Sequence, residues 1–247
     1  MSAYSDKNVV ITGGGSGIGL AMAELLVDGG ARVVITGRSQ PTLDTARKRL
    51  GENVIAVRGD VAQLSDLDVL ADRVKGEFGT VDALFVNAGI TRTMPFESTT
   101  EQFYDDLFAT NVKGAYFTVQ KLAPLLSAGA GVVLTTSIAN VMGLEEAGVY
   151  AAGKAALRSM ARSLSRELLP RGIRVNAISP GPVDTGTLEK TMTAEAAEQF
   201  KAQRVAANPM RRFGTPDEIA RAAAFLAFDA TYTTGTELAV DGGASQL

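Results

Sequence analysis

Short apolar runs rich in valine and isoleucine alternate with amphipathic segments along the whole chain. The runs are continuously apolar, which is typical of strands that helices cover on both faces of a parallel sheet. Seven strands are expected, at residues 8–12, 32–36, 54–58, 83–87, 131–136, 173–178 and 237–240. Helical periodicity predicts helices between them, over 18–28, 41–50, 65–77, 101–126, 149–169 and 216–228. This alternation predicts a single α/β domain over residues 1–247: an open, doubly wound parallel sheet with helices on both faces.

One long connection interrupts the regular alternation. Residues 181–212 begin with PGPVDTGT, continue as a helix-prone stretch, and exceed the usual length of a strand-to-helix connection. Long connections in compact folds are often functional, so a flap over a ligand site is predicted at about 184–212. An insertion packed on the surface is the alternative.

Composition excludes several classes of protein. The formal net charge is −3, and lysine and arginine do not cluster, which argues against nucleic acid as a partner. No run approaches the ~18 apolar residues that a membrane-spanning helix needs, and no signal peptide is visible. The chain has no cysteine, which excludes disulfides and thiolate metal sites, and nothing in it indicates a metal site. A cytoplasmic location is therefore predicted.

A glycine-rich turn, TGGGSGIG at residues 12–19, joins the first strand to the first helix. Its glycines allow the backbone to approach a pyrophosphate, and the helix N-terminus offers free N–H groups. No Gly-Lys-Ser/Thr follows, so the turn is not a P-loop of the nucleoside triphosphatases. The expected cofactor-binding residues here are Gly13, Gly15, Ser16, Gly17, Ile18 and Gly19.

The end of the second strand indicates which dinucleotide binds. Folds that bind NAD place an acidic residue there for the ribose 2′-hydroxyl, whereas this strand ends in Gly37 followed by Arg38 and Ser39. A guanidinium pairs with a 2′-phosphate, so NADP(H) is preferred over NAD(H). The ends of the third and fourth strands add Asp60, Val61, Asn87, Ala88 and Gly89 to the expected cofactor site.

Proton transfer has to proceed without histidine, because the chain contains none. Tyr150 and Lys154 lie four positions apart in a predicted helix, and therefore on one of its faces. A phenol titrates near ~10, so it ionises near neutrality only beside positive charge, which an ammonium and an oxidised nicotinamide would provide. Ser137, at the end of the fifth strand, is placed to hold a substrate oxygen beside the phenol.

These motifs occur together in one order: TGGGSGIG, NAG, TNVKGAYF, LTTS, YAAGK and ISPGPVDT. In that combination the sequence resembles the short-chain dehydrogenase/reductase family over essentially the whole chain, which implies a Rossmann-type fold. The resemblance implies that Tyr150 is the general acid or base, that Lys154 favours its ionised form and binds the nicotinamide ribose, and that Ser137 orients the substrate. Asn111 would hold a water molecule of a proton relay. Pro180, Gly181, Val183 and Thr185 would seat the nicotinamide.

The resemblance also suggests a reaction and an assembly. The chain looks most like NADPH-dependent carbonyl reductases, also called secondary-alcohol dehydrogenases, acting on a small carbonyl or alcohol substrate. A homotetramer is implied, with the C-terminal VDGGASQL near a neighbouring subunit. A mainly apolar substrate pocket is expected from Ala139, Leu144, Leu188 and Met192.

Two other functions stay open at this point. A 3-oxoacyl-[acyl-carrier-protein] reductase shares the fold and the four catalytic positions, but residues 122–134 lack the basic stretch that an acidic carrier protein would contact. Ser16 also stands where those reductases often have arginine, which leaves Arg38 as the main phosphate anchor. A non-catalytic dinucleotide-binding regulator is the other alternative, and all four catalytic positions being intact speaks against it.

Overall fold

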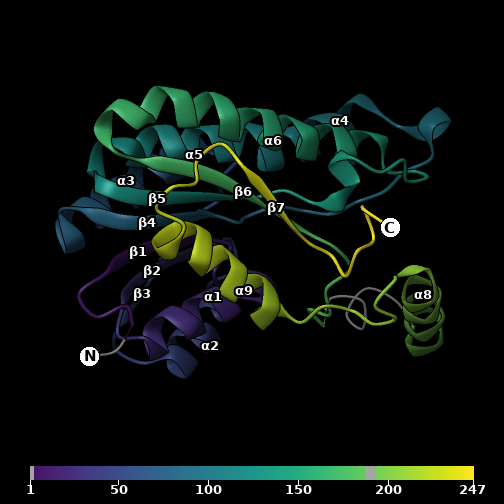
Figure 1. Cartoon of the computed structure of the whole chain (residues 1–247), viewed down its shortest axis with the longest axis horizontal. Helices are drawn as coiled ribbons and strands as arrows, with labels where there is room; N and C mark the ends of the chain where they lie inside the picture. Colours follow the sequence, from purple (N-terminus) through teal and green to yellow (C-terminus); the bar gives the residue numbers. More distant parts are fainter. Residues whose placement is uncertain (1–2, 187–192) are drawn as a thin grey trace.

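The expected strands form one parallel sheet (Figure 1). A computed structural model of the chain describes residues 3–186 and 193–247. In that part of the chain seven strands pair in the order β3-β2-β1-β4-β5-β6-β7. Their bounds are β1 Asn8–Thr12, β2 Arg32–Gly37, β3 Val54–Arg58, β4 Val81–Val86, β5 Leu126–Thr135, β6 Arg174–Pro180 and β7 Glu237–Val240. The predicted fold class is confirmed.

Helices cover both faces of this sheet, which explains why its strands are continuously apolar. One layer contains α1 (Gly17–Asp28), α2 (Gln40–Leu50) and α9 (Pro216–Ala224); the other contains α3 (Leu64–Phe78), α5 (Gly114–Leu122) and α6 (Gly148–Leu168) (Figure 1). Successive strand residues point to opposite faces. Val9 and Ile11 accordingly join the core beneath α1, whereas Val10 joins the core on the other face.

The strand order reverses between β1 and β4. From β1 the chain proceeds outward through β2 and β3, and it then returns to β4 and continues outward on the other side. The connections that follow β1 and β4 therefore diverge, and a crevice opens between them at the carboxyl ends of the strands. This crevice is where ligands bind in open α/β sheets.

Two helices begin with a capping residue followed by a proline in the first turn. Ser39 caps α2 by accepting a hydrogen bond from the Thr42 amide, with Pro41 in the first turn. Thr215 and Glu218 form a reciprocal capping box at the start of α9, and Pro216 is its first residue. These caps fix where both helices begin.

The single helix predicted over 101–126 is wrong. The structure has α4 (Glu101–Phe108), a π-helical turn over Ala109–Lys113, α5, and a 3-10 turn over Ala123–Leu125, after which Leu126 begins β5. Pro124 in the 3-10 turn has no N–H to continue an α-helix. The prediction over 216–228 errs in the same way, because α9 gives way to a π-helical turn over Phe225–Asp229.

The long connection after β6 contains one described helix, α8 (Ala194–Ala207), which stands apart from the sheet (Figure 1). Its C-terminal end is anchored, because Asn208 Nδ2 donates a hydrogen bond of 2.8 Å to the carbonyl of Asp241. Leu188 and Met192, two of the residues predicted for the substrate pocket, lie outside the described residues.

Candidate active site

Two adjoining cavities occupy the crevice at the carboxyl ends of the strands. Their volumes are about 240 Å³ and 370 Å³, and Gly13, Ser16, Ala88, Gly89 and Ile90 line both. The smaller cavity is also lined by the predicted residues Gly15, Arg38, Ser39, Asp60 and Val61. The larger one is also lined by Gly17, Ile18, Asn87, Ser137, Tyr150, Lys154, Pro180, Gly181, Val183 and Thr185. The crevice therefore brings together residues predicted from seven separate stretches of sequence.

The glycine-rich turn leaves room for a ligand because side chains are sterically excluded from it. Gly13 has φ +68°, a left-handed conformation that favours glycine. A Cβ on Gly19 would lie 2.2 Å from the Gly13 carbonyl oxygen, so Gly19 must lack a side chain for α1 to pack this closely. Ser16 precedes α1 but its side chain makes no capping hydrogen bond, which leaves first-turn amides for an anion. This cradle fits the pyrophosphate of a dinucleotide.

Thr12 holds the loop after β4 against this turn. Its Oγ1 accepts hydrogen bonds of 3.0 Å from the backbone amides of both Asn87 and Ala88, and the side chain is fully buried. This role of Thr12 is not among those predicted from the sequence. The sequence does contain a signal for it, because a threonine at the end of an otherwise apolar strand indicates a buried polar contact.

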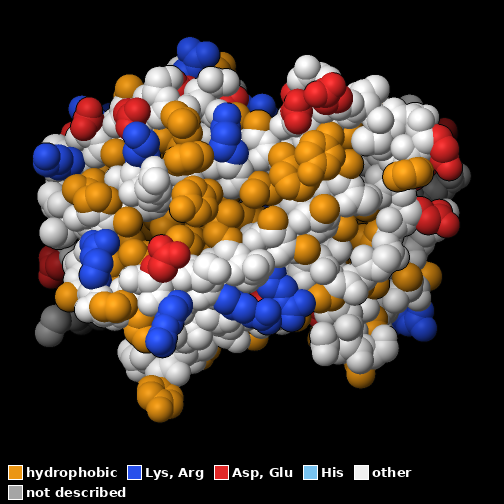
Figure 2. Space-filling model, turned by 90° about the horizontal axis from the view of Figure 1, so that it is seen from above, with side chains coloured by type: hydrophobic (Ala, Val, Ile, Leu, Met, Phe, Trp, Pro, Cys, Tyr) orange, Lys and Arg blue, Asp and Glu red, His pale blue; other side chains and the backbone are white. Residues whose placement is uncertain are grey.

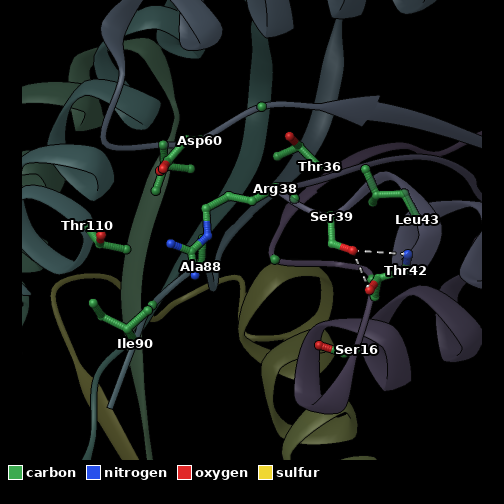
Figure 3. Close-up of a pocket in the computed structure, with 16 residues that line it drawn as sticks. Ser16, Thr36, Arg38, Ser39, Thr42, Leu43, Asp60, Ala88, Ile90 and Thr110 are labelled. Atoms are coloured by element: carbon green, nitrogen blue, oxygen red, sulfur yellow. Dashed lines mark hydrogen bonds between the residues drawn. The ribbon is translucent and has the colours of Figure 1, made fainter. Parts of the chain in front are cut away.

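Arg38 projects from the end of β2 into the smaller cavity. Figure 3 shows its guanidinium reaching across the cavity towards Ala88, with Asp60 and Thr110 on the opposite wall. Ser39 lies beside it, and its Oγ accepts hydrogen bonds from the amide and the hydroxyl of Thr42. Gly37 contributes no carboxylate where a dinucleotide's 2′ position would meet the strand end. An exposed guanidinium is thus available for an anion at this wall.

Asp60 shapes the turn after β3. Its Oδ1 accepts a hydrogen bond of 3.0 Å from the Ala62 amide, and its own amide donates to Asp66 Oδ2 at 2.8 Å. The side chain lines the cavity while it holds this turn.

Ser137, Tyr150 and Lys154 line one wall of the larger cavity. Ser137 lies two residues after the end of β5, and its extended backbone carries the hydroxyl to the cavity. Tyr150 and Lys154 occupy the first two turns of α6, and Lys154 Nζ lies 5.7 Å from the centre of the Tyr150 ring. The helix and the strand thus present a hydroxyl, a phenol and an ammonium to the same space.

Lys154 is held rigidly in this wall. Only 5% of the residue is exposed, and Nζ donates a hydrogen bond of 2.8 Å to the Thr135 carbonyl. Burial lowers the pKa of the Lys154 ammonium, and the nearby Tyr150 oxygen opposes that shift. Among the described residues this is the one hydrogen bond of the ammonium, so its other N–H donors are available to a ligand or to the phenol.

Asn111 lies in the π-helical turn between α4 and α5 and is 1% exposed. Its Oδ1 accepts from the Ile90 amide at 2.8 Å, and its Nδ2 donates to the Ile90 carbonyl at 2.9 Å. The side chain therefore fixes the loop that carries Gly89, where a Cβ would lie 3.5 Å from Lys154 Nζ. Holding a water molecule, the role implied for Asn111 by resemblance, stays a prediction.

Two predicted pocket residues are absent from the lining of these cavities. Ala139 is 3% exposed, and its amide donates to Ser137 Oγ at 3.3 Å. Neither Ala139 nor Leu144 lines the two cavities.

In the part of the chain that the structure describes, no helix is both long enough and apolar enough to cross a bilayer. The cytoplasmic location stays a prediction.

Comparison with known proteins agrees with this geometry. A family model described as Enoyl-(Acyl carrier protein) reductase matches residues 13–245. Oxidoreductase asL5 of Sarocladium schorii is 40% identical over 98% of this chain and 96% of its own length. L-fucose dehydrogenase of Mus musculus is 34% identical over 99% of this chain and 90% of its own. Among solved structures, a short-chain dehydrogenase/reductase of Brucella melitensis, described as glucose/ribitol dehydrogenase, is 31% identical. It superposes with a TM-score of 0.92 over 99% of this chain and 98% of its own.

Proposed function

The chain belongs to the short-chain dehydrogenase/reductase family, whose oxidoreductases use nicotinamide dinucleotides, and on that premise we propose that it interconverts ketones and secondary alcohols with NADP(H). The observation that carries the proposal is the shared wall of Ser137, Tyr150 and Lys154 in the larger cavity. Gly13 of the glycine-rich cradle lines the same cavity.

Each of the three side chains has a distinct task in this proposal. Tyr150 gives its phenolic proton to the carbonyl oxygen during reduction and takes it back during oxidation. Ser137 donates a hydrogen bond to the same oxygen and stabilises the charge that develops there. Lys154 stabilises the phenolate with its ammonium, which Thr135 holds in place. The bound nicotinamide supplies or accepts the hydride.

The preference for NADP(H) is supported by Arg38. Its exposed guanidinium lines the smaller cavity, and Gly37 before it offers no carboxylate to repel a 2′-phosphate. A hydrogen bond to a charged group contributes about 1.5 to 3 kcal/mol, which is about 10- to 150-fold in affinity. Replacing Arg38 with alanine is expected to lower kcat/KM for NADPH by about that factor and to leave kcat/KM for NADH within about twofold.

Association into a homotetramer is proposed as well. The helices on one face of the sheet carry exposed apolar side chains, among them Val69 of α3, Tyr104 of α4 and Tyr116 of α5. Figure 2 shows broad apolar patches on that side of the molecule. Contiguous exposed apolar surface marks interaction sites in soluble proteins. Light scattering on the purified protein measures the assembled mass directly.

The test of the function is oxidation of NADPH, followed by its absorbance, against a panel of carbonyl compounds. The panel contains an aryl ketone, an aliphatic ketone, a diketone, a sugar ketone and an acetoacetyl thioester, each with NADPH and with NADH. Turnover of simple ketones with NADPH supports the proposal, whereas preference for the thioester indicates an acyl-carrier-protein substrate. No turnover of any compound, despite tight NADPH binding, indicates a regulator.

The Arg38→Ala variant, with Arg47→Ala as control, separates phosphate recognition from net charge. Arg47 is an exposed arginine of α2 that does not line either cavity, so its loss changes the charge equally. Equal effects of the two substitutions on NADPH use contradict the role given to Arg38.

A further inference from the structure

Glu237, the first residue of β7, makes three contacts that the reaction described above does not use. Its Oε1 lies 2.6 Å from Thr136 Oγ1 and 2.7 Å from Asn140 Nδ2. Its Oε2 lies 3.1 Å from Arg158 Nε, and only 12% of the carboxylate side chain is exposed. A mostly buried carboxylate requires such partners, because it is costly to remove from water without them.

Two of these partners lie on either side of Ser137. Thr136 precedes it, and Asn140 donates a second hydrogen bond, of 2.7 Å, to the carbonyl of Ser137 itself. Asn140 Oδ1 is buried and has no partner among the described residues, so this amide is held through Nδ2 alone. Among the described residues, removing Glu237 therefore leaves the Asn140 side chain with a single hydrogen bond and the Thr136 hydroxyl with only the Ile178 carbonyl, at 2.8 Å.

The third partner belongs to the helix that carries the phenol. Tyr150, Lys154 and Arg158 follow one another at intervals of four in α6, so they lie along one side of it. Lys154 attaches this side to Thr135 at the end of β5, and Arg158 attaches it through Glu237 to Thr136 and Asn140. The segment with Ser137 is thus connected to α6 at two points.

The backbone of Glu237 is itself fixed, because it pairs with Ala177 in the parallel ladder between β6 and β7. A carboxylate on a strand is a more rigid reference than one on a loop. The contacts span 97 and 101 residues of sequence, so they join segments that no local interaction would align.

We propose that Glu237 is a positioning residue for the reaction, which holds the Ser137 hydroxyl in register with the Tyr150 phenol through Thr136, Asn140 and Arg158. This inference rests on the proposed function, because it assigns the two hydroxyls to one substrate oxygen. A displacement of about 1 Å between reacting groups costs on the order of 100-fold in rate. Glu237 lies outside the residues that line the two cavities, so its loss is expected to act on kcat and not on cofactor affinity.

The test compares two substitutions of Glu237 in the full-length protein. Glu237→Leu removes all three contacts, and we expect kcat to fall by about 10- to 100-fold with the NADPH dissociation constant within twofold of the wild type. Glu237→Gln keeps an oxygen for Thr136 and Asn140 but loses the ion pair, so we expect a smaller fall in kcat, of about two- to tenfold. The matched control is Glu77→Leu, which removes a carboxylate paired at 3.0 Å with Arg73 on α3.

A merely structural role predicts a different result. In that case Glu237→Leu lowers the melting temperature while kcat per NADPH-binding site stays within twofold of the wild type, and the inference is overturned. If Glu237→Leu does not fold, Thr136→Val and Asn140→Ala remove the contacts one at a time. Unchanged kcat in both of these variants overturns the inference equally.

Tyr150→Phe in the same assay separates this inference from the function it rests on. An inactive Tyr150→Phe together with a fully active Glu237→Leu refutes the positioning role alone. An active Tyr150→Phe refutes the proposed chemistry, and the positioning role with it.

Discussion

Arg174 makes a prediction about stability that follows directly from its contacts. This first residue of β6 is 8% exposed, and it donates hydrogen bonds to three backbone carbonyls, those of Leu226, Ala227 and Ala230. All three acceptors lie in or directly after the π-helical turn that follows α9. Arg174 therefore attaches the end of that helix to the sheet.

The expected cost of Arg174→Met can be estimated from these bonds. The Ala230 carbonyl still accepts a hydrogen bond of 3.1 Å from the Thr233 amide, so two buried carbonyls lose their donor. Each carbonyl left without a donor costs about 1 to 3 kcal/mol, so the gross loss is about 2 to 6 kcal/mol. Burial lowers the pKa of Arg174, which means that the charged form is itself disfavoured where it lies. Removing that buried charge also removes its desolvation cost, which offsets part of the destabilisation. We expect a net destabilisation of about 2 to 4 kcal/mol.

Thermal unfolding followed by circular dichroism measures this effect. For a domain of this size each kcal/mol of destabilisation lowers the unfolding midpoint by about 2 to 4 °C, so the midpoint should fall by about 4 to 16 °C. Arg32→Met is the matched control, because Arg32 is exposed and donates to a single carbonyl, that of Glu77, at 3.2 Å. A midpoint for Arg174→Met within 2 °C of the wild type, or equal to that of Arg32→Met, refutes the reasoning.

Three further predictions concern titration and close packing. The pKa of buried Lys154 lies below its ordinary 10.5, so the folded state binds fewer protons than the unfolded one between those two values. The free energy of unfolding of the wild type, relative to that of Lys154→Met, should therefore rise with pH across that window when it is measured by denaturant titration. A relative free energy of unfolding that falls with pH contradicts the assignment. The hydrogen bonds from Arg212 hold the pKa of Glu218 at about 2, against an ordinary 4.5. The wild type should thus be more stable than Glu218→Gln at pH 7, and this difference should disappear as pH falls from 4.5 to about 2. A difference that persists in thermal unfolding below pH 2 contradicts this assignment. Gly19→Ala should abolish NADPH binding in a fluorescence titration, since its Cβ would meet the Gly13 carbonyl, whereas Gly76→Ala, with nothing within 4 Å, should bind normally.

The sheet could be predicted from sequence because each strand is an apolar run that both layers of helices cover. The largest difference is at the start of β5, which begins at Leu126 and not at residue 131. Leu126 pairs with Val81, and the register shifts before Gly131 pairs with Ala83. Ser127, Ala128 and Gly129, which show no strand pattern, therefore lie in an irregular part of the strand. Tertiary pairing of this kind overrides local preference. The π-helical turns were missed because one extra residue in a turn leaves hydrophobic periodicity nearly unchanged.

Much of the crevice lining could be predicted because the topology brings the carboxyl ends of parallel strands together. Residues one or two positions after the end of a strand, such as Arg38, Asp60 and Ser137, are therefore brought to the same edge of the sheet. The partners of Glu237 could not be found in this way. Thr136 lies just after β5 and Arg158 lies in α6, and both are far from Glu237 in sequence. No local sequence pattern relates a glutamate in β7 to either residue.

The most direct test of the proposed chemistry is a single turnover of bound NADPH by Tyr150→Phe, with a ketone that the wild type reduces. Loss of the phenolic proton donor should slow the reduction by about 100- to 10,000-fold, while the NADPH dissociation constant stays within about twofold. That result assigns proton transfer to Tyr150 and leaves the cofactor cradle intact. A variant that keeps more than about a tenth of the wild-type rate contradicts the account, because another group would then have to supply the proton.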